Sequence, residues 1–508
     1  MSNKYLFIAE ADKIQDLLFR SSKLREVSGG SQMLEEFCKD AVPQLIQELN
    51  GTKIISDGGS FRILFDSKEK AEEFGEYLSE FYRRELGGTI TIAQRVEITS
   101  DRDAIKQAQT NLRRAKHRDK LPISVEQMPY IAICASCGIG IAIDYKSRFP
   151  DEKENYLCEV CEKKAKAREN IKKRFPRQFL TDIQNGERQE LDFPRKDADE
   201  VAELEPRNYI AYIVADGNNM GTIFNSSNNF EQLGKLSEGL DNVIHRSLAN
   251  PTKILLEKQN GFLQKPGKSS TLIPVLPLIL GGDDVFALLP ARWALDFTLR
   301  FSKEFEKNME EFLSEIQLQT KLSPTISAAV VICKGKFPYL AAHGIAEELL
   351  KMAKKRAKKE KSSTVSFTVL TGSEVVKAPE EEKRFVAGFT AYTVKELEKL
   401  IDYRYKLKNL PGTRRAQLET LFLRAEKLDF AEMKNEWIPE GSSILDRLEE
   451  KLRKTVNKAL VELGDRGTEG NWLMIEGKYF HQLPDLLRAW DFAYDLEKDI
   501  SEYEEEEK

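Results

Sequence analysis

The residues best suited to chemistry are two adjacent aspartates, Asp283 and Asp284, which follow a pair of glycines. Apolar runs at residues 274–280 and 285–289 flank them. This pattern predicts two strands joined by a short turn, because glycine reaches positive φ without a steric cost. Neighbouring carboxylates at the tip of an apolar hairpin suit a divalent metal ion, since hard cations prefer carboxylate oxygens. A solvated turn with two turn-favouring aspartates is the alternative for this motif taken alone.

A third carboxylate, Asp216, follows the apolar run at residues 209–215 and precedes Gly217. In a ferredoxin-like sheet this strand lies beside the hairpin, which would bring Asp216 near Asp283 and Asp284. Three converging carboxylates repel one another, so two Mg²⁺ or Mn²⁺ ions are expected between them. Such a pair serves nucleotidyl transfer by activating the attacking hydroxyl and stabilising the leaving pyrophosphate. We therefore predict that the three aspartates are catalytic, and that they and Gly217 bind the metal ions.

Residues near these motifs are expected to bind the nucleotide. Lysines recur at helical spacing in a predicted helix over residues 341–361, so one row can face a triphosphate, although a solvated face is the alternative for most of them. In the N-terminal part, Gly29 and Gly30 suit a bend before a helix capped by Ser31, which could hold an anion or be an ordinary helix start. The predicted nucleotide-binding residues are Gly281, Gly282, Asn218, Asn219, Met220, Gly221, Lys354, Lys358, Gly58, Gly59, Ser60 and Ser31.

Two stretches of the chain have the same predicted order: strand, helix, hairpin with a Gly-Gly turn, helix, strand, helix. This order predicts two copies of one supersecondary unit. The first copy has Gly-Gly-Ser where the second has Gly-Gly-Asp-Asp, so it is expected to bind a nucleotide passively, without the catalytic metals. The expected strands cover residues 5–9, 53–56, 61–65, 89–98, 209–215, 274–280, 285–289, 324–333 and 363–370, and the expected helices 68–85, 101–117, 291–315 and 341–361.

Four cysteines have the spacing C-x2-C-x20-C-x2-C. Two such turns direct four thiolates toward one point, which predicts a tetrahedral structural site for one Zn²⁺ ion; a redox pair or an iron–sulfur cluster is less favoured. The ligands are Cys134, Cys137, Cys158 and Cys161. The remaining Cys38 and Cys333 lie in apolar surroundings and are expected in the core.

The segments after the cysteines are mainly polar or helical in pattern. Basic runs at 163–168 and 172–174 could line a phosphate backbone or form a solvated helix face, and residues 178–206 suggest a linker or loosely ordered loop. From Thr393 onward the strand signals fade, and apolar residues at helical spacing predict an α-helical bundle with helices at 397–407, 416–428, 444–463 and 483–500. The bundle is expected to begin with a net basic surface that includes Arg404. The acidic tail at 502–507 is expected to be solvated.

The length predicts roughly three or four domains, and the two CxxC pairs favour a reducing cytoplasm and a bound metal over disulfides. The chain has 508 residues, a net charge of −5, and no apolar run long enough to span a membrane. The near-balanced charge argues against indiscriminate coating of nucleic acid. The predicted fold class is α+β: a degenerate first palm domain (1–125), a zinc-knuckle insert with a helical linker (126–205), a second palm domain (206–375) and an α-helical bundle (376–508). Both palms are expected to be ferredoxin-like, as in nucleotide cyclases.

Several of these features together resemble one known family. The hairpin at 280–286, the segment at 215–221, the helix around Lys354 and the inserted four-cysteine knuckle are similar to the large, polymerase-like subunit of type III CRISPR effector complexes. Residues 23–31 also resemble the first palm unit of that family. The resemblance covers roughly residues 4 to 375 and, more weakly, the helical C-terminus.

The resemblance implies an RNA-activated antiviral enzyme. In that family the second palm joins ATP into cyclic oligoadenylates when the complex holds target RNA, and the degenerate first palm holds a second nucleotide. Metal ligation by Asp216, Asp283 and Asp284 is implied. The implied partners are guide RNA and target RNA, held through the complex, together with its backbone, small helical and guide-end-capping subunits.

One departure concerns the start of the chain. Many family members begin with an HD nuclease domain, whereas this sequence starts directly in the first palm, and none of its four histidines has an adjacent aspartate. We therefore expect no single-stranded DNase activity from this chain.

The sequence leaves three alternatives to this function. Some relatives join ATP to another small molecule, which would give a different product from the same fold. A catalytically silent scaffold subunit is disfavoured by the intact aspartates. A stand-alone dinucleotide cyclase of the GGDEF type is disfavoured by Asp284-Val285, by the duplicated palm and by the cysteine insert.

Overall fold

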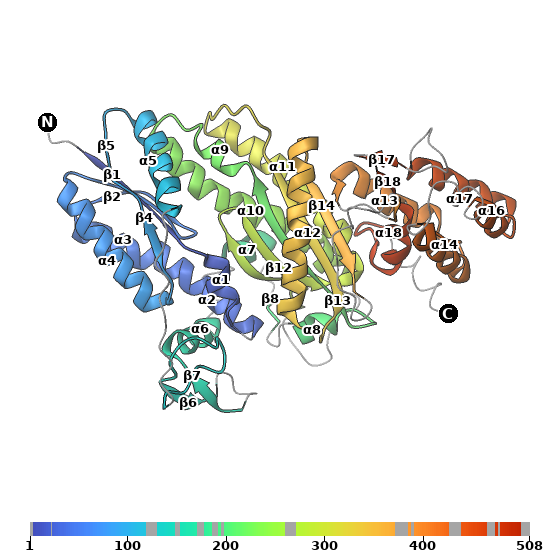
Figure 1. Cartoon of the computed structure of the whole chain (residues 1–508), viewed down its shortest axis with the longest axis horizontal. Coiled ribbons are helices and arrows are strands. Elements are labelled where there is room, and N and C mark those ends of the chain that lie inside the picture. Colours follow the sequence, from blue (N-terminus) through green and yellow to red (C-terminus); the bar gives the residue numbers. More distant parts are fainter. Residues whose placement is uncertain are drawn as a thin grey trace.

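The computed structural model shows the chain as a row of domains, with a small insert projecting from the N-terminal half (Figure 1). The structure describes residues 4–21, 23–117, 130–147, 153–169, 177–184, 191–194, 198–259, 271–370, 385–387, 391–425, 438–464, 473–475 and 478–498. The basic run at 172–174 and the acidic tail at 502–507 lie outside the described residues.

The N-terminal domain is a sheet with the strand order β2-β3-β1-β4, with β5 also pairing with β1. The hairpin β2–β3 has a two-residue turn, Gly58–Gly59, in which both residues have positive φ. Helix α4 begins after Ser67, whose side chain accepts the N–H of Lys70 as an N-cap. The elements are β1 (Tyr5–Ala11), α1 (Ile14–Phe19), α2 (Leu24–Glu36), the π-helix η1 (Phe37–Ala41), α3 (Val42–Glu48), β2 (Thr52–Asp57), β3 (Ser60–Phe65), α4 (Lys68–Leu86), β4 (Ile90–Ile92), β5 (Val96–Glu97) and α5 (Asp101–Lys116).

The central domain repeats this arrangement in a larger sheet. Its strand order is β11-β12-β9-β13-β14-β16, so the hairpin, the first strand and the fourth strand follow one another as in the N-terminal sheet. The prediction of two ferredoxin-like units is therefore confirmed. The elements are β9 (Tyr209–Asn218), α9 (Met220–Phe224), α10 (Phe230–Gln259), β10 (Thr271–Leu272), β11 (Leu276–Gly281), β12 (Asp284–Pro290), the 3₁₀ turn η3 (Ala291–Trp293), α11 (Ala294–Glu315), β13 (Thr325–Lys334), α12 (Tyr339–Glu360), β14 (Thr364–Val369) and β16 (Tyr392–Thr393).

The middle strands of this sheet form the centre of the core. Nearly every residue of β9 and β13 is buried, as expected for strands covered on both faces. Helix α12 packs against β9, β13 and β14 and runs across the front of the sheet in Figure 1. Burial of each large apolar side chain contributes about 1.5–3 kcal/mol, so this layer fixes the strand ends that carry the aspartates.

The prediction of a bend and helix start at Gly29–Ser31 is wrong. Helix α2 begins at Leu24, and Gly29, Gly30 and Ser31 lie buried within it. A Cβ atom at Gly29 would lie 1.9 Å from the carbonyl oxygen of Lys164, so these glycines allow helix α6 (Glu159–Glu169) to pack closely against α2. Ser31 is therefore not at a helix N-terminus and offers no anion site there.

The cysteine insert is a small unit of β6 (Asp144–Lys146), β7 (Asn155–Leu157) and α6. It projects below the N-terminal domain in Figure 1. The basic face predicted for α6 is instead used in packing: Lys164 is buried and donates to the carbonyl of Leu17 at 2.7 Å, and Arg168 donates to that of Pro194 at 3.0 Å. The predicted linker over 178–206 also has regular structure: α7 (Arg177–Gln184), β8 (Leu191–Asp192) and α8 (Ala198–Ala202).

The C-terminal region is mainly helical, as predicted, but it also contains a small sheet of order β15-β18-β17. The prediction that strands end before this region is wrong. The expected helix at 483–500 stops early, and Arg404 is only 2% exposed because it stacks on Trp490 and Tyr494. The elements are β15 (Phe385–Ala387), α13 (Val394–Lys406), α14 (Gly412–Ala425), α16 (Ile438–Leu445), α17 (Glu450–Glu462), β17 (Leu473–Ile475), β18 (Lys478–His481), α18 (Leu483–Arg488) and η6 (Trp490–Phe492).

Within the part of the chain that the structure describes, no helix combines the length and the apolar character needed to cross a bilayer.

Candidate functional site

The predicted proximity of the aspartates is confirmed by the register of the central sheet. Strands β9 and β12 are antiparallel, and Asp284 is the direct cross-strand partner of Asp216. The backbone N–H of Gly217 donates to the carbonyl of Asp283 at 3.3 Å. The sheet therefore brings together two carboxylates that are 68 positions apart in the sequence (284 − 216 = 68) and places the third at the adjoining turn.

The turn itself depends on glycine at two places. Gly282 has φ +60°, a backbone conformation that residues other than glycine rarely adopt. Gly217 faces the turn, and a Cβ atom there would lie 2.9 Å from the Cβ of Asp283 and 2.7 Å from the Cγ of Met220. Glycine at 217 therefore allows the strand end and the aspartate turn to approach each other.

The electrostatics of the three carboxylates favour a cation. Burial, followed by the charge of Asp216, raises the pKa of Asp283. Burial and the charges of Asp283 and Asp216 raise the pKa of Asp284. One positive group compensates in part: the ammonium of Lys354 lies 2.7 Å from a carboxylate oxygen of Asp216. The three side chains offer only carboxylate oxygens as ligands, which suits Mg²⁺ or Mn²⁺. A bound cation would offset the repulsion between the carboxylates and favour their ionised forms.

A cavity of about 310 Å³ adjoins the aspartates and lies between the two palm domains. The second palm contributes Asp283, Asp284 and the predicted residues Gly281, Gly282, Met220 and Gly221, and the first palm contributes the predicted Gly58 and Ser60. The two turns face each other, because a Cβ atom at Gly58 would lie 3.9 Å from the backbone nitrogen of Gly282.

Other predicted residues have structural roles. Asn218 is buried, donates to Thr325 at 3.1 Å and accepts from Ser327 at 2.9 Å. Asn219 precedes α9 in a left-handed conformation. A Cβ atom at Gly59 would lie 2.5 Å from the side chain of Ile14, so this glycine serves packing.

Lysine 358 lies one helical turn beyond Lys354 on α12 and is exposed. It does not line the cavity between the palms. Of the predicted lysines, the structure places Lys354 in contact with the aspartates.

Sequence reasoning missed several cavity residues of the first palm: Glu10, Asp57, Arg62 and Gln109. A signal for Glu10 was available, because it ends the first strand of its unit as Asp216 ends the first strand of the other. No motif marks Arg62 or Gln109, which reach the cavity only through the folding of β3 and α5.

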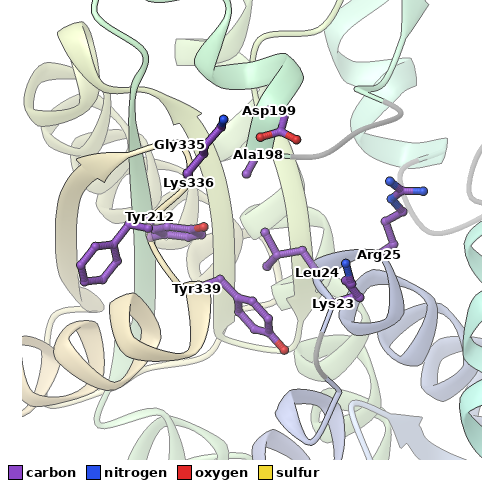
Figure 2. Close-up of a pocket in the computed structure, with 10 residues that line it drawn as sticks. Lys23, Leu24, Arg25, Ala198, Asp199, Tyr212, Gly335, Lys336 and Tyr339 are labelled. Carbon is purple, nitrogen blue, oxygen red and sulfur yellow. The ribbon is translucent and has the colours of Figure 1, made fainter. Parts of the chain in front are cut away.

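A second cavity, of about 200 Å³, lies near the start of β9 (Figure 2). Lys23, Arg25 and Tyr339 line it together with Tyr212. Tyr212 and Asp216 share a strand, and four residues along a strand span about 13 Å. This second cavity is therefore separate from the aspartates.

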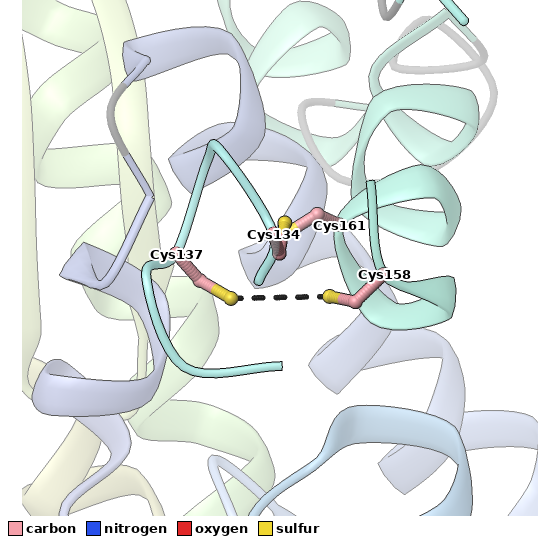
Figure 3. Close-up of side chains that lie close together, drawn as sticks. All are labelled: Cys134, Cys137, Cys158 and Cys161. Atoms are coloured by element: carbon pink, nitrogen blue, oxygen red, sulfur yellow. Dashed lines mark hydrogen bonds between the residues drawn. The ribbon is translucent and has the colours of Figure 1, made fainter. Parts of the chain in front are cut away.

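The four predicted zinc ligands come together, as Figure 3 shows. The Sγ atoms of Cys134, Cys137, Cys158 and Cys161 all lie within 4.8 Å of one another. The Cys137–Cys158 sulfur distance is 3.9 Å, close to the roughly 3.8 Å between ligands of a tetrahedral zinc site with Zn–S bonds of about 2.3 Å. Four thiolates leave no open coordination position, so the site fits a structural zinc ion.

Comparison with known proteins agrees with this geometry. Residues 209–363 match the family described as Cas10/Cmr2, second palm domain. Among solved structures, Csm1 of T. onnurineus superposes with a TM-score of 0.56 at 14% identity, covering 97% of this chain and 70% of that one. A Csm1–Csm4 cassette in complex with cA4 gives a TM-score of 0.55 at 14% identity, with 90% and 67% covered. No curated protein matches this sequence. The chain thus has a Csm1-like fold, and its residues 209–363 are similar to the second palm domain of Cas10/Cmr2, which confirms the resemblance to the type III polymerase-like subunit.

Proposed function

We propose that this chain is an RNA-activated nucleotidyltransferase that joins ATP into cyclic oligoadenylates within a type III CRISPR antiviral complex. The observation that carries the proposal is the direct pairing of Asp216 with Asp284 beside a cavity that two palm domains share. A cavity between two nucleotide-cyclase-like palms suits two nucleotides, which is what the formation of a phosphodiester bond requires.

The residues of the second palm have distinct roles in this proposal. Asp216, Asp283 and Asp284 would hold two Mg²⁺ or Mn²⁺ ions, which activate the attacking hydroxyl and stabilise the leaving pyrophosphate. Gly281 and Gly282 keep side chains away from the phosphates. Lys354, which contacts Asp216, would meet the triphosphate once cations neutralise that carboxylate.

The similar solved structures support the choice of substrate and partners. Csm1–Csm4 cassettes have been solved with cA4 and with pppApApA, the latter at a TM-score of 0.53. By analogy, this chain would bind ATP and adenylate products and would assemble with a Csm4-like subunit. Activation by guide-bound target RNA and contacts with the backbone and small helical subunits are part of the same proposal.

The test is product formation by the assembled effector complex. The complex, with guide RNA, is incubated with radiolabelled ATP and Mg²⁺ or Mn²⁺, with and without matching target RNA. We expect cyclic oligoadenylate only with target RNA, and a loss of at least a hundredfold in the double variant Asp283→Asn/Asp284→Asn, because the metal ligands are neutralised. An Asp446→Asn variant, at an aspartate that is 71% exposed in the C-terminal region, is the matched control and should retain full activity.

Equal product from the double variant and the wild type would reject the site. A product that contains another small molecule joined to adenylate would support the alternative in which ATP is joined to that molecule, and the catalytic site would be unchanged. No product under any condition, from a correctly assembled complex, would leave the scaffold alternative.

A further inference from the structure

A buried arginine lies in the first-palm wall of the cavity. Arg62 is on β3, two residues after Ser60, so both side chains are on the same face of the strand. Arg62 is 9% exposed, and it lines the same cavity as Asp283 and Asp284. Its guanidinium therefore faces the space that the proposed nucleotides would occupy.

Among the residues that the structure describes, Arg62 forms no ion pair. The guanidinium donates to two neutral oxygens, the hydroxyl of Ser60 at 3.3 Å and the side-chain carbonyl of Gln109 at 3.2 Å. Among the described residues, no carboxylate oxygen lies within 4.0 Å of it, and the nearby Glu10 is engaged by Lys116. Burial lowers the pKa of Arg62 and the charge of Glu10 acts in the opposite direction, and an arginine keeps its charge at neutral pH. A desolvated cation with neutral partners at a cavity wall favours an anionic ligand.

The position of Arg62 also distinguishes the two palms. Ser60 is the cross-strand partner of Glu10, just as Asp284 is the partner of Asp216. The first palm thus has Ser60 where the second has the paired Asp284, and it has Arg62 at the position where the second has Phe286, two residues after Asp284.

We propose that Arg62 binds a phosphate group of the nucleotide held by the first palm, replacing the metal ions with a fixed guanidinium, and that Gln109 orients it. This inference rests on the proposed function for the identity of the nucleotide. Guanidinium presents several N–H donors in a planar fork, which matches two phosphate oxygens. The side chain of Gln109, on α5, accepts one N–H of the Arg62 guanidinium and leaves other N–H groups to bind the ligand.

Binding measured in the absence of divalent metal ions tests the contact between Arg62 and phosphate separately from metal-mediated binding. Equilibrium titrations of the full chain use β,γ-imido-ATP, tripolyphosphate and adenosine in buffer free of Mg²⁺ and Mn²⁺. Arg62→Gln removes the charge, and Gln109→Glu supplies a carboxylate that neutralises the guanidinium without deleting it. Arg83→Gln, at an arginine that is 67% exposed on α4, is the matched control.

We expect Arg62→Gln and Gln109→Glu to weaken binding of both phosphate-bearing probes by about tenfold or more while leaving adenosine binding unchanged, because charge-assisted hydrogen bonds to phosphate are lost. Arg83→Gln should bind all probes as the wild type does. If Arg62→Gln does not fold, as judged by its melting curve, Gln109→Glu decides alone.

Unchanged binding of tripolyphosphate and β,γ-imido-ATP in the folded variants would overturn the inference, and so would an equal loss of adenosine binding. The readout is independent of catalysis. A failure of the proposed cyclase activity, seen as no product with Mg²⁺, would therefore be distinguished from a failure of Arg62 to bind phosphate.

Discussion

Glu10 occupies in the first sheet the position that Asp216 occupies in the second. Each residue lies near the end of the first strand of its unit, opposite the residue that begins the last strand of the hairpin. Each is contacted by a lysine from the helix that follows the fourth strand of its unit, Lys116 on α5 and Lys354 on α12. The two palms therefore share a carboxylate–lysine pair, but only one of them adds the Asp283–Asp284 turn.

This symmetry gives a matched test of Lys354. Replacing it with glutamine (Lys354→Gln) should lower product formation by about tenfold or more, because the proposed contact with the triphosphate loses its charge. Lys116→Gln, which breaks the equivalent pair in the palm without the aspartate turn, should change product formation by about twofold or less. Both pairs are partly exposed, so each variant should alter the free energy of unfolding by about 1 kcal/mol or less. Product yield and melting curves give the readouts, and equal losses in the two variants would contradict the assignment.

The approach of β9 to the aspartate turn can be tested without changing any charge. Gly217→Ala places a methyl group 2.9 Å from the Cβ of Asp283, so the turn must shift and metal-dependent product formation should fall by on the order of tenfold to a hundredfold. Gly344→Ala is the matched control because Gly344 is exposed on α12, does not line the cavity, and a Cβ atom there meets nothing within 4 Å. Titration of product formation with Mn²⁺ should show a higher metal requirement for Gly217→Ala only. The same requirement in both variants would mean that this close approach does not position Asp283.

The contact between the two palms should respond to acid through His343. Its ring lies 3.7 Å from that of Phe19 in the first palm and 5.4 Å from that of Phe286, and burial lowers its pKa from 6.5 to about 4. The unfolded state therefore binds a proton that the folded state does not bind between these values. Stability is full above pH about 6.5 and falls as the pH approaches 4, by on the order of 3 kcal/mol from this residue.

The measurement is the free energy of unfolding as a function of pH. His343→Gln removes the titrating ring and should flatten the part of the curve between pH 6.5 and 4, whereas His117→Gln, at an exposed histidine at the end of α5, should not. Burial lowers the pKa of His481 to about 3, so this residue also makes the free energy of unfolding fall at low pH, and both variants retain that contribution. A curve unchanged by His343→Gln would show that its ring is solvated.

Zinc in the cysteine insert should stabilise the first palm through helix packing. We expect one zinc ion per chain by elemental analysis, lost in Cys158→Ser and retained in Cys333→Ala, whose thiol is buried elsewhere. Because α6 begins between two of the ligands and packs against α2, zinc loss should also raise amide hydrogen exchange in residues 24–36. Unchanged exchange in zinc-free protein would mean that the α2–α6 contact forms without the metal ion.

Local patterns in the sequence were sufficient to predict several features of this protein. The duplicated order of strands and helices, both Gly-Gly turns and the four-cysteine spacing could be read directly, because hydrophobic periodicity and turn chemistry are local. The proximity of Asp216 to Asp284 also followed, since a ferredoxin-like order fixes which strands are neighbours. The metal and nucleotide roles of these residues stay predictions.

Features that depend on contacts between distant segments became apparent from the folded structure alone. Gly29 and Gly30 suggested a bend, yet they lie inside a helix because α6 packs against them, and that packing outweighs the local preference of glycine. Lys164, Arg168 and Arg404 looked like a solvated basic surface, but each is buried against another segment of the chain. Lys164 donates to Leu17, Arg168 donates to Pro194 and Arg404 donates to Trp490. Arg62 lines the shared cavity although no sequence motif marks it. The cavity forms where the two palms face each other, so the hydrophobic periodicity of either palm alone does not predict it.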